Sequence, residues 1–217
     1  MIYCIGDSFT FGEELPDTNS AWPILLGNLL DRPVVNLGKP ATGNYRMVKR
    51  TMDSVLSGDA ELVVIGWTDP ARQEFADDIG ITDLWAGREH RRMQSCNDHR
   101  INLIKYMTAY DVPGYYYTKW LRQIILVQSF CKANQVRCIM FNACSSEDWH
   151  KLYLDKNAQL AKHIDSTDFV GWPYSGSGIW THGMPKGPNG HFLEEGHVAV
   201  ANKIFNHIQN ESTDTRV

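Results

Sequence analysis

The sequence has few of the features that mark a disulfide-bonded or zinc-binding protein. Its 217 residues include five cysteines, an odd number, and no two of them have the CxxC spacing. We therefore expect reduced thiols, no metal site and a cytoplasmic location. Every apolar run is shorter than the roughly 18 residues that a membrane-spanning helix requires. The first residues, MIYCIGDSFTFG, lack a charged leader and a long hydrophobic stretch, so we expect no signal peptide and no membrane association.

The charge balance and the lack of phosphate-binding motifs exclude further classes of partner. Lys and Arg number 21 against 25 Asp and Glu, a formal net charge of −4. This balance implies no broad cationic surface, so nucleic acid is not an expected partner. The first turn has neither the GxGxxG nor the GxxxxGKS/T pattern, which argues against a flavodoxin-like protein that binds a nucleotide there.

Hydrophobic patterning predicts strands that alternate with helices. No repeat or linker interrupts the chain, so we expect one domain over residues 1–217. Short apolar runs typical of strands in a parallel sheet are Met1–Ile5, Val34–Leu37, Glu61–Gly66 and Val136–Asn142. Helical patterns cover Ala21–Leu30 (with Ser20 as N-cap), Asn44–Leu56, Thr118–Ala133 and Glu194–Ile208. The alternation predicts an α/β fold, a three-layer α/β/α sandwich with a mainly parallel, flavodoxin-like sheet.

Two segments do not follow this alternation of strands and helices. Residues 70–117 are polar and aromatic, and residues 170–192 are rich in Gly, Pro and Trp. We predict the first as an irregular insertion, and we expect both to gather over the carboxyl edge of the sheet. Ligands of open α/β sheets bind at that edge.

A serine and a histidine are the leading candidates for chemistry there. Ser8 lies in Gly6-Asp7-Ser8-Phe9-Thr10, directly after the first predicted strand, where N–H groups can bind a developing oxyanion. This serine is either an N-cap or a nucleophile, and a nucleophile needs a base. His191, in a Gly/Pro-rich turn before the last helix, is the expected base, with His182 a weaker candidate. His197, on the apolar face of that helix, is expected to be a core or helix-start histidine.

Four short blocks occur in order along most of the chain. They are GDSFTFG with Ser8, NLGKPATGN over Asn36–Asn44, VIGWTD over Val64–Asp69, and Asn189-Gly190-His191 followed by Glu195-Gly196-His197. Together they resemble the SGNH (GDSL-type) hydrolases, in particular small phage-encoded members. The resemblance implies an SGNH hydrolase-like fold and a serine-dependent acyl ester hydrolase, with no cofactor and no metal.

The resemblance also implies a set of site residues. Ser8 would attack an acyl carbon, and His191 would take its proton. The oxyanion would be held by the Ser8 N–H, the Ala41 N–H and the Thr68 side chain. The family usually has glycine at the position of Ala41, which a shifted register matches to Gly43, and asparagine at the position of Thr68. Expected substrate contacts are Asn44, Trp67 and Asp69.

The acid of the triad is the main departure from the family pattern. The family commonly has aspartate two or three residues before the histidine, where this chain has Asn189 and Pro188. Asn189 can orient the imidazole, but it lacks the charge that stabilises an imidazolium. Either the site works as a Ser–His dyad, or a carboxylate comes from elsewhere. Candidates for that carboxylate are Asp69, Asp7 and Glu194.

Aromatic residues suggest the kind of substrate. Seven Trp and nine Tyr are many for this length, and several fall in the predicted edge loops. Aromatic faces suit sugar rings or acyl chains, although each ring taken singly is better explained by core packing. We expect a small-molecule or carbohydrate ester with a short acyl group, O-acetylated carbohydrate being favoured. The alternative is a catalytically weak or inactive SGNH-fold module that binds a carbohydrate or another small ligand.

Overall fold

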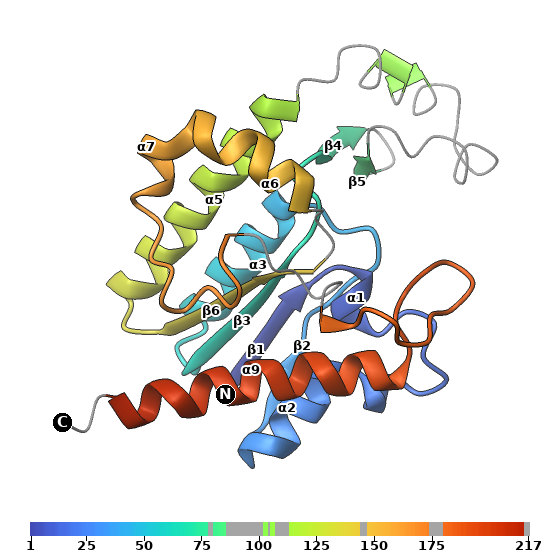
Figure 1. Cartoon of the computed structure of the whole chain (residues 1–217), viewed down its shortest axis with the longest axis vertical. Coiled ribbons are helices and arrows are strands. Elements are labelled where there is room, and N and C mark those ends of the chain that lie inside the picture. Colours follow the sequence, from blue (N-terminus) through green and yellow to red (C-terminus); the bar gives the residue numbers. More distant parts are fainter. Residues whose placement is uncertain are drawn as a thin grey trace.

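The central sheet has the strands that the apolar runs predict. A computed structural model describes the backbone of residues 1–77, 80–85, 102–103, 105–106, 113–143, 147–173 and 180–214. Its main strands are β1 (Ile2–Gly6), β2 (Val34–Asn36), β3 (Leu62–Trp67) and β6 (Arg137–Asn142). They form one sheet in the order β2-β1-β3-β6, and every neighbouring pair is parallel (Figure 1). Each strand starts and ends within one residue of its predicted bounds.

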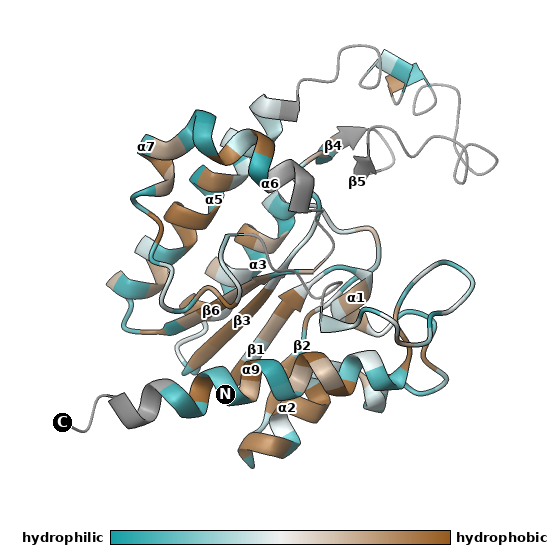
Figure 2. Ribbon diagram, in the orientation of Figure 1, coloured by the Kyte–Doolittle hydropathy of each residue, from teal (hydrophilic) through white to brown (hydrophobic). Residues whose placement is uncertain are grey.

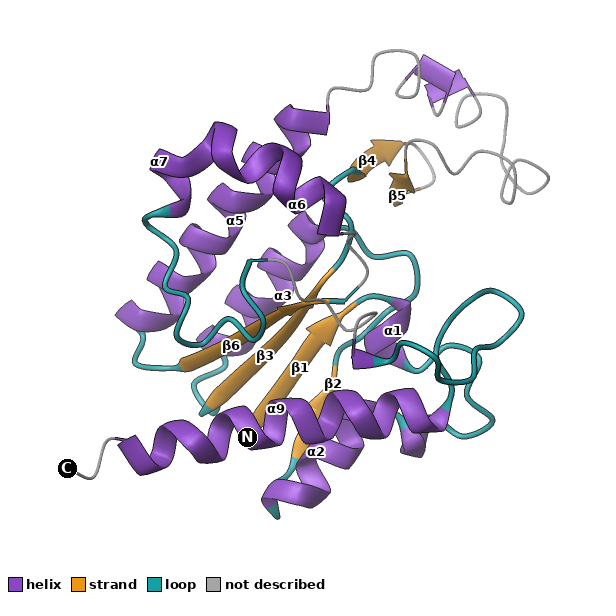
Figure 3. Cartoon of the chain, in the orientation of Figure 1, coloured by secondary structure: helices purple, strands orange, loops and turns teal. Residues whose placement is uncertain are grey.

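Helices cover both faces of this sheet. On one face lie α2 (Trp22–Leu30) and α9 (Glu194–Asp214), and on the other lie α3 (Asn44–Leu56) and α5 (Pro113–Ala133) (Figure 3). The predicted three-layer α/β/α sandwich with a mainly parallel sheet is confirmed. The order of the strands puts β1 and β3 at the centre, and the carboxyl end of β1 leads directly into α1 (Ser8–Phe11).

The core divides into two clusters because side chains alternate along each strand. In β3, Leu62 and Val64 pack with α2 and α9, whereas Val63, Ile65 and Trp67 pack with α3 and α5. All six residues of β3 are buried. This two-sided burial explains the continuous apolar reading LVVIGW, and Figure 2 shows hydrophobic residues along the strands.

Helix starts differ from the predictions where tertiary contacts decide them. Ser20 ends the short η1 (Thr18–Ser20), and Ala21 is the N-cap of α2 without a side-chain cap. The predicted Ser20 cap is therefore wrong, because the Trp22 N–H is satisfied by His197 Nδ1 at 3.0 Å instead. Similarly, α5 starts five residues before the predicted Thr118. Burial of Tyr117, whose ring packs on Trp120, draws this turn into the helix.

The segment 70–117 is only partly irregular. It begins with an antiparallel hairpin of β4 (Arg72–Asp77) and β5 (Gly80–Trp85), seen beyond the end of the main sheet in Figure 1. Most of its remainder up to residue 112 lies outside the described residues. After β6 come α6 (Glu147–Leu154), η4 (Asp155–Asn157) and α7 (Ala158–Ala161), which the patterning does not predict. Across the described part of the chain, no helix is both long and apolar enough to cross a membrane.

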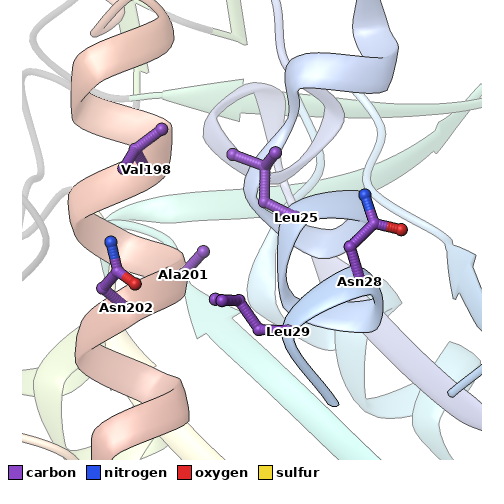
Figure 4. Close-up of a pocket in the computed structure, with 6 residues that line it drawn as sticks. All are labelled: Leu25, Asn28, Leu29, Val198, Ala201 and Asn202. Carbon is purple, nitrogen blue, oxygen red and sulfur yellow. The ribbon is translucent and has the colours of Figure 1, made fainter. Parts of the chain in front are cut away.

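A small pocket lies between α2 and α9 (Figure 4). Its volume is about 260 Å³, and it is lined by Leu25, Asn28, Leu29, Val198, Ala201 and Asn202. None of these residues is a predicted site residue.

Candidate active site

A tight turn at the carboxyl end of β1 presents Ser8. Gly6 ends the strand, and a Cβ there would lie 2.0 Å from Thr10 Oγ1, so only glycine lets α1 pack this closely on the strand. The Asp7 side chain caps α1 by accepting a hydrogen bond from the Phe9 N–H at 3.0 Å. Ser8 is thus the first residue of a short, capped helix at the sheet edge.

His191 reaches Ser8 from the far end of the chain. Its Nε2 is 2.8 Å from Ser8 Oγ. The turn before it is held by hydrogen bonds from the Gly187 N–H to the His191 carbonyl (2.8 Å) and from the Gly190 N–H to the Gly187 carbonyl (2.9 Å). Phe9 packs against the imidazole, with ring centroids 4.8 Å apart. The fold therefore brings together the serine and the histidine that the sequence selects.

The carboxylate that completes the row is Glu14, six residues after Ser8. Glu14 Oε2 lies 2.8 Å from His191 Nδ1 and also accepts the His191 backbone N–H at 3.1 Å. Glu14 Oε1 accepts the Asn189 backbone N–H at 2.8 Å and its side-chain amide at 3.2 Å. A Cβ on Gly187 would lie 2.6 Å from Glu14 Cδ, so glycine at 187 leaves the room that this carboxylate occupies.

This arrangement fixes the proton positions on His191. An ionised carboxylate only accepts hydrogen bonds, so Nδ1 carries a hydrogen toward Glu14 and the Nε2 lone pair faces the Ser8 hydroxyl. Burial acts to raise the pKa of the Glu14 carboxyl, but the hydrogen bonds from Asn189 and His191 outweigh it and hold that pKa below its ordinary value. Glu14 is also in the left-handed region at φ +73°, a conformation that costs a non-glycine residue energy and is often found at functional sites.

Neither Asn189 nor the carboxylates that the sequence offers as the acid has a contact with the His191 ring among those described below. Asn189 was predicted to orient the imidazole, but its hydrogen bonds go to Glu14, which contacts the ring in its place. Asp69 Oδ1 accepts the Ala71 N–H at 2.8 Å within its own turn. Glu194 is exposed in the first turn of α9. Asp7 is fully buried beneath the Ser8 turn.

A buried polar network surrounds Asp7. Its Oδ2 accepts the Thr68 hydroxyl at 2.6 Å and lies 3.2 Å from Arg72 Nη1. The same nitrogen of Arg72 donates to the Thr42 carbonyl at 3.2 Å. Thr68 is 1% exposed, and its one donor hydrogen goes to Asp7. Thr68, the predicted oxyanion donor, thus holds Asp7 and through it the Ser8 turn.

The loop that carries Ala41 packs directly against α1. The Lys39 N–H donates to the Gly6 carbonyl at 3.1 Å, and a Cβ on Gly38 would lie 2.4 Å from the Phe11 nitrogen. Ala41 has φ +59°, in the region that favours glycine. This backbone conformation agrees with the glycine that the SGNH hydrolases usually have at this position.

The three predicted substrate contacts are mostly internal. Asn44, 3% exposed, accepts the Thr68 N–H at 3.0 Å and donates to the Thr68 carbonyl at 3.1 Å, so it joins α3 to the end of β3. Trp67 is fully buried in the core and therefore does not face a ligand. Asp69 is partly exposed, and its side chain holds the turn after β3.

His197 is a structural histidine. It is 1% exposed, its Nδ1 accepts the Trp22 N–H, and its ring packs on Phe192 with centroids 4.5 Å apart. Burial, with a smaller effect of the charge on His191, lowers the pKa of His197 to about 4. The ring therefore stays neutral in the folded protein at neutral pH.

Sequence reasoning missed Glu14 and Arg72. Glu14 follows Ser8 within one loop, in Gly12-Glu13-Glu14-Leu15, but neither charge nor spacing distinguishes it from Glu13. Arg72 follows the third block by three residues, in a segment that is predicted to be irregular. Among the described residues there is no group of three metal-ligating side chains.

Comparison with known proteins supports this description of the fold. No protein-family model and no curated protein matches the sequence. Similar solved structures include a lipolytic protein of the G-D-S-L family from Desulfitobacterium hafniense DCB-2, 18% identical, with TM-score 0.56 and coverage of 95% of this chain and 98% of that one. The psychrotrophic esterase EstA from Pseudoalteromonas sp. is 10% identical, with TM-score 0.60 and 98% of both chains covered.

An acetylxylan esterase, Axe2 from Geobacillus stearothermophilus, is 13% identical, with TM-score 0.55 and coverage of 95% of this chain and 93% of that one. At these identities the likeness concerns the fold. The chain therefore has the fold of the SGNH (GDSL-type) hydrolases, and the resemblance read from its four blocks is confirmed at that level.

Proposed function

We propose that this protein is a serine ester hydrolase in which Ser8, His191 and Glu14 form the catalytic triad. The observation that carries the proposal is the continuous row of contacts from Ser8 Oγ to His191 Nε2 and from His191 Nδ1 to Glu14 Oε2, each 2.8 Å. A nucleophile, a base and a group that orients the base are what acyl transfer requires.

The contacts define the role of each group. His191 Nε2 accepts the Ser8 proton as Oγ attacks the acyl carbon, and Glu14 stabilises the resulting imidazolium. The proton then passes to the leaving alcohol oxygen, and water repeats the cycle on the acyl-enzyme. We assign the oxyanion to the backbone N–H groups of Ser8 and Ala41, because the loop of Ala41 packs against α1. Arg72 and Thr68 hold Asp7, and through it the Ser8 turn.

Short-acyl esters, including O-acetylated carbohydrates, are the proposed substrates. The presence of an acetylxylan esterase among the structures of similar fold favours an acetyl ester of a sugar. The complete Ser8–His191–Glu14 row favours turnover over binding alone, because a binding module needs no base aligned with a serine.

Acetate release from p-nitrophenyl acetate and from acetylated xylan tests this function. Wild-type protein should turn over both esters, and Ser8→Ala and His191→Ala should fall to the background rate while staying folded. Equal rates in all three proteins would overturn the proposal. Binding of acetylated xylan that survives in Ser8→Ala without any turnover by the wild type would favour the binding-module alternative.

A further inference from the structure

A second carboxylate lies on the accessible side of the candidate site. Glu13 Oε2 is 3.6 Å from His191 Nε2, the nitrogen that faces Ser8 Oγ. The Glu13 side chain is 38% exposed, whereas that of Glu14 is 9% exposed. The Glu13 N–H donates to the Ser8 carbonyl at 3.1 Å, which fixes this residue beside the nucleophile. Glu13 thus sets a negative charge that a ligand can reach next to Nε2.

Within the part of the chain that the structure describes, no lysine or arginine neutralises the charge of Glu13. Among the described residues, the Glu13 carboxylate lies within ion-pair distance of the His191 ring and of no lysine or arginine. Arg72, the cation beneath the Ser8 turn, is 8% exposed and pairs with Asp7. Two carboxylates therefore flank one imidazole: Glu14, enclosed by donors, orients the ring, and Glu13 faces outward.

The proposed reaction brings one part of the substrate to Glu13. When the tetrahedral intermediate collapses, the bond between the acyl carbon and the alcohol oxygen breaks, and the Nε2 hydrogen passes to that oxygen. The leaving oxygen must then lie within hydrogen-bond reach of Nε2. Substituents of the alcohol consequently lie near Glu13, and the acyl group lies on the other side of the ester bond.

We propose that Glu13 selects the alcohol part of the substrate by its charge. The preferred substrates are short-acyl esters of alcohols that carry an ammonium group, such as amino alcohols and amino sugars, and esters of anionic alcohols such as uronic acids are disfavoured. This inference rests on the proposed esterase function. For unit charges about 7 Å apart at an effective dielectric constant of about 40 to 80, Coulomb's law gives a preference of roughly three- to sevenfold.

Three acetate esters of similar size test the proposal: acetylcholine, its neutral isostere 3,3-dimethylbutyl acetate, and anionic 3-acetoxypropionate. Acetate release gives kcat/KM for each ester with wild-type protein, Glu13→Gln and a control, Asp155→Asn. The control removes one charge from the exposed η4. Ratios between esters within one variant cancel differences in folded fraction. Measurements at ionic strengths of about 0.01 M and about 1 M change the screening length from about 30 Å to about 3 Å.

The proposal predicts that Glu13→Gln lowers the cationic-to-neutral ratio and raises the anionic-to-neutral ratio, each roughly three- to sevenfold. Asp155→Asn should keep the wild-type ratios, and high salt should bring wild type close to Glu13→Gln. Unchanged ratios in Glu13→Gln would overturn the proposal, and so would an equal fall in kcat/KM for all three esters. Wild-type protein that hydrolyses none of the esters and has an unreactive Ser8 would instead overturn the esterase function itself.

Discussion

Replacing Glu14 by glutamine removes one charge and converts one carboxylate oxygen into an NH₂ group. Each Glu14 oxygen accepts two hydrogen bonds, from His191 at one oxygen and from Asn189 at the other. Either orientation of the glutamine amide therefore sets its NH₂ group against two donors. With the NH₂ toward Nδ1, the ring takes the tautomer with hydrogen on Nε2, and the Ser8 proton has no acceptor. With the oxygen toward Nδ1, the tautomer is kept but the imidazolium loses its counter-charge.

The size of the effect follows from these losses. The equivalent change of acid to amide in a serine protease lowers kcat about 10⁴-fold. We expect kcat to fall about 10²- to 10⁴-fold in Glu14→Gln, or about 3 to 5 kcal/mol of transition-state stabilisation. The fall should appear in kcat more than in KM, because the carboxylate acts on the charge that develops on His191.

Steady-state hydrolysis of a neutral acetate ester, with thermal unfolding as a check of folding, measures this effect. Glu194→Gln is the matched control, because it makes the same chemical change at an exposed carboxylate in the first turn of α9. It should keep wild-type kcat. A folded Glu14→Gln protein with kcat within about threefold of wild type would refute the role of Glu14, since the loss of a triad acid costs far more.

Three further changes test the surroundings of the proposed triad. Gly187→Ala places a Cβ 2.6 Å from the carboxyl carbon of Glu14, and kcat should fall about 100-fold because the carboxylate is displaced. Gly114→Ala is the control: its nearest new contact is at 3.4 Å, and the hydrolysis rate should not change. Arg72→Met removes the guanidinium that faces the buried Asp7 carboxylate and should lower the free energy of unfolding by about 3 to 5 kcal/mol. Part of this free energy should be restored in Asp7→Asn/Arg72→Met, and additive losses in urea unfolding would contradict the pairing. The pKa of His197 is about 4 in the folded protein, below its value in the unfolded chain. The neutral ring therefore contributes stability that is complete above about pH 6.5 and is lost as the pH falls toward 4. Urea unfolding across that range should show a loss of about 3 kcal/mol that is missing from the pH dependence of His197→Gln.

Most of the fold could be predicted because the central strands β1 and β3 are largely buried on both sides. A run such as LVVIGW has few alternatives to a central parallel strand, and the strand–helix alternation then predicts the layers. Errors occur where distant contacts decide a helix start. The Trp22 N–H is satisfied by His197, which is 175 residues away in sequence, and no local pattern around Ser20 contains that information.

The sequence predicts the Ser8 and His191 pair that the structure brings together, but it does not predict the residues that support this pair. Ser8 and His191 follow from their positions after a strand and before a helix, because strand ends gather at one sheet edge. Glu14 was missed because its selection over Glu13 depends on the space that Gly187 leaves, on donors from Asn189 and on a backbone φ of +73°. Trp67 and Thr68 were expected to face a ligand, but strand alternation turns Trp67 into the core, and Asp7 takes the Thr68 hydroxyl.

Reaction with a fluorophosphonate tests the central claim most directly, because the reagent forms a stable bond only with an activated serine. The folded protein is incubated with the reagent, and the adduct is located by mass spectrometry of its peptides. We predict one phosphonyl group on Ser8 in the wild type, much slower labelling in Glu14→Gln, and none in Ser8→Ala or His191→Ala. Folded wild-type protein whose Ser8 stays unmodified, or is modified equally fast without the His191 imidazole, would contradict it.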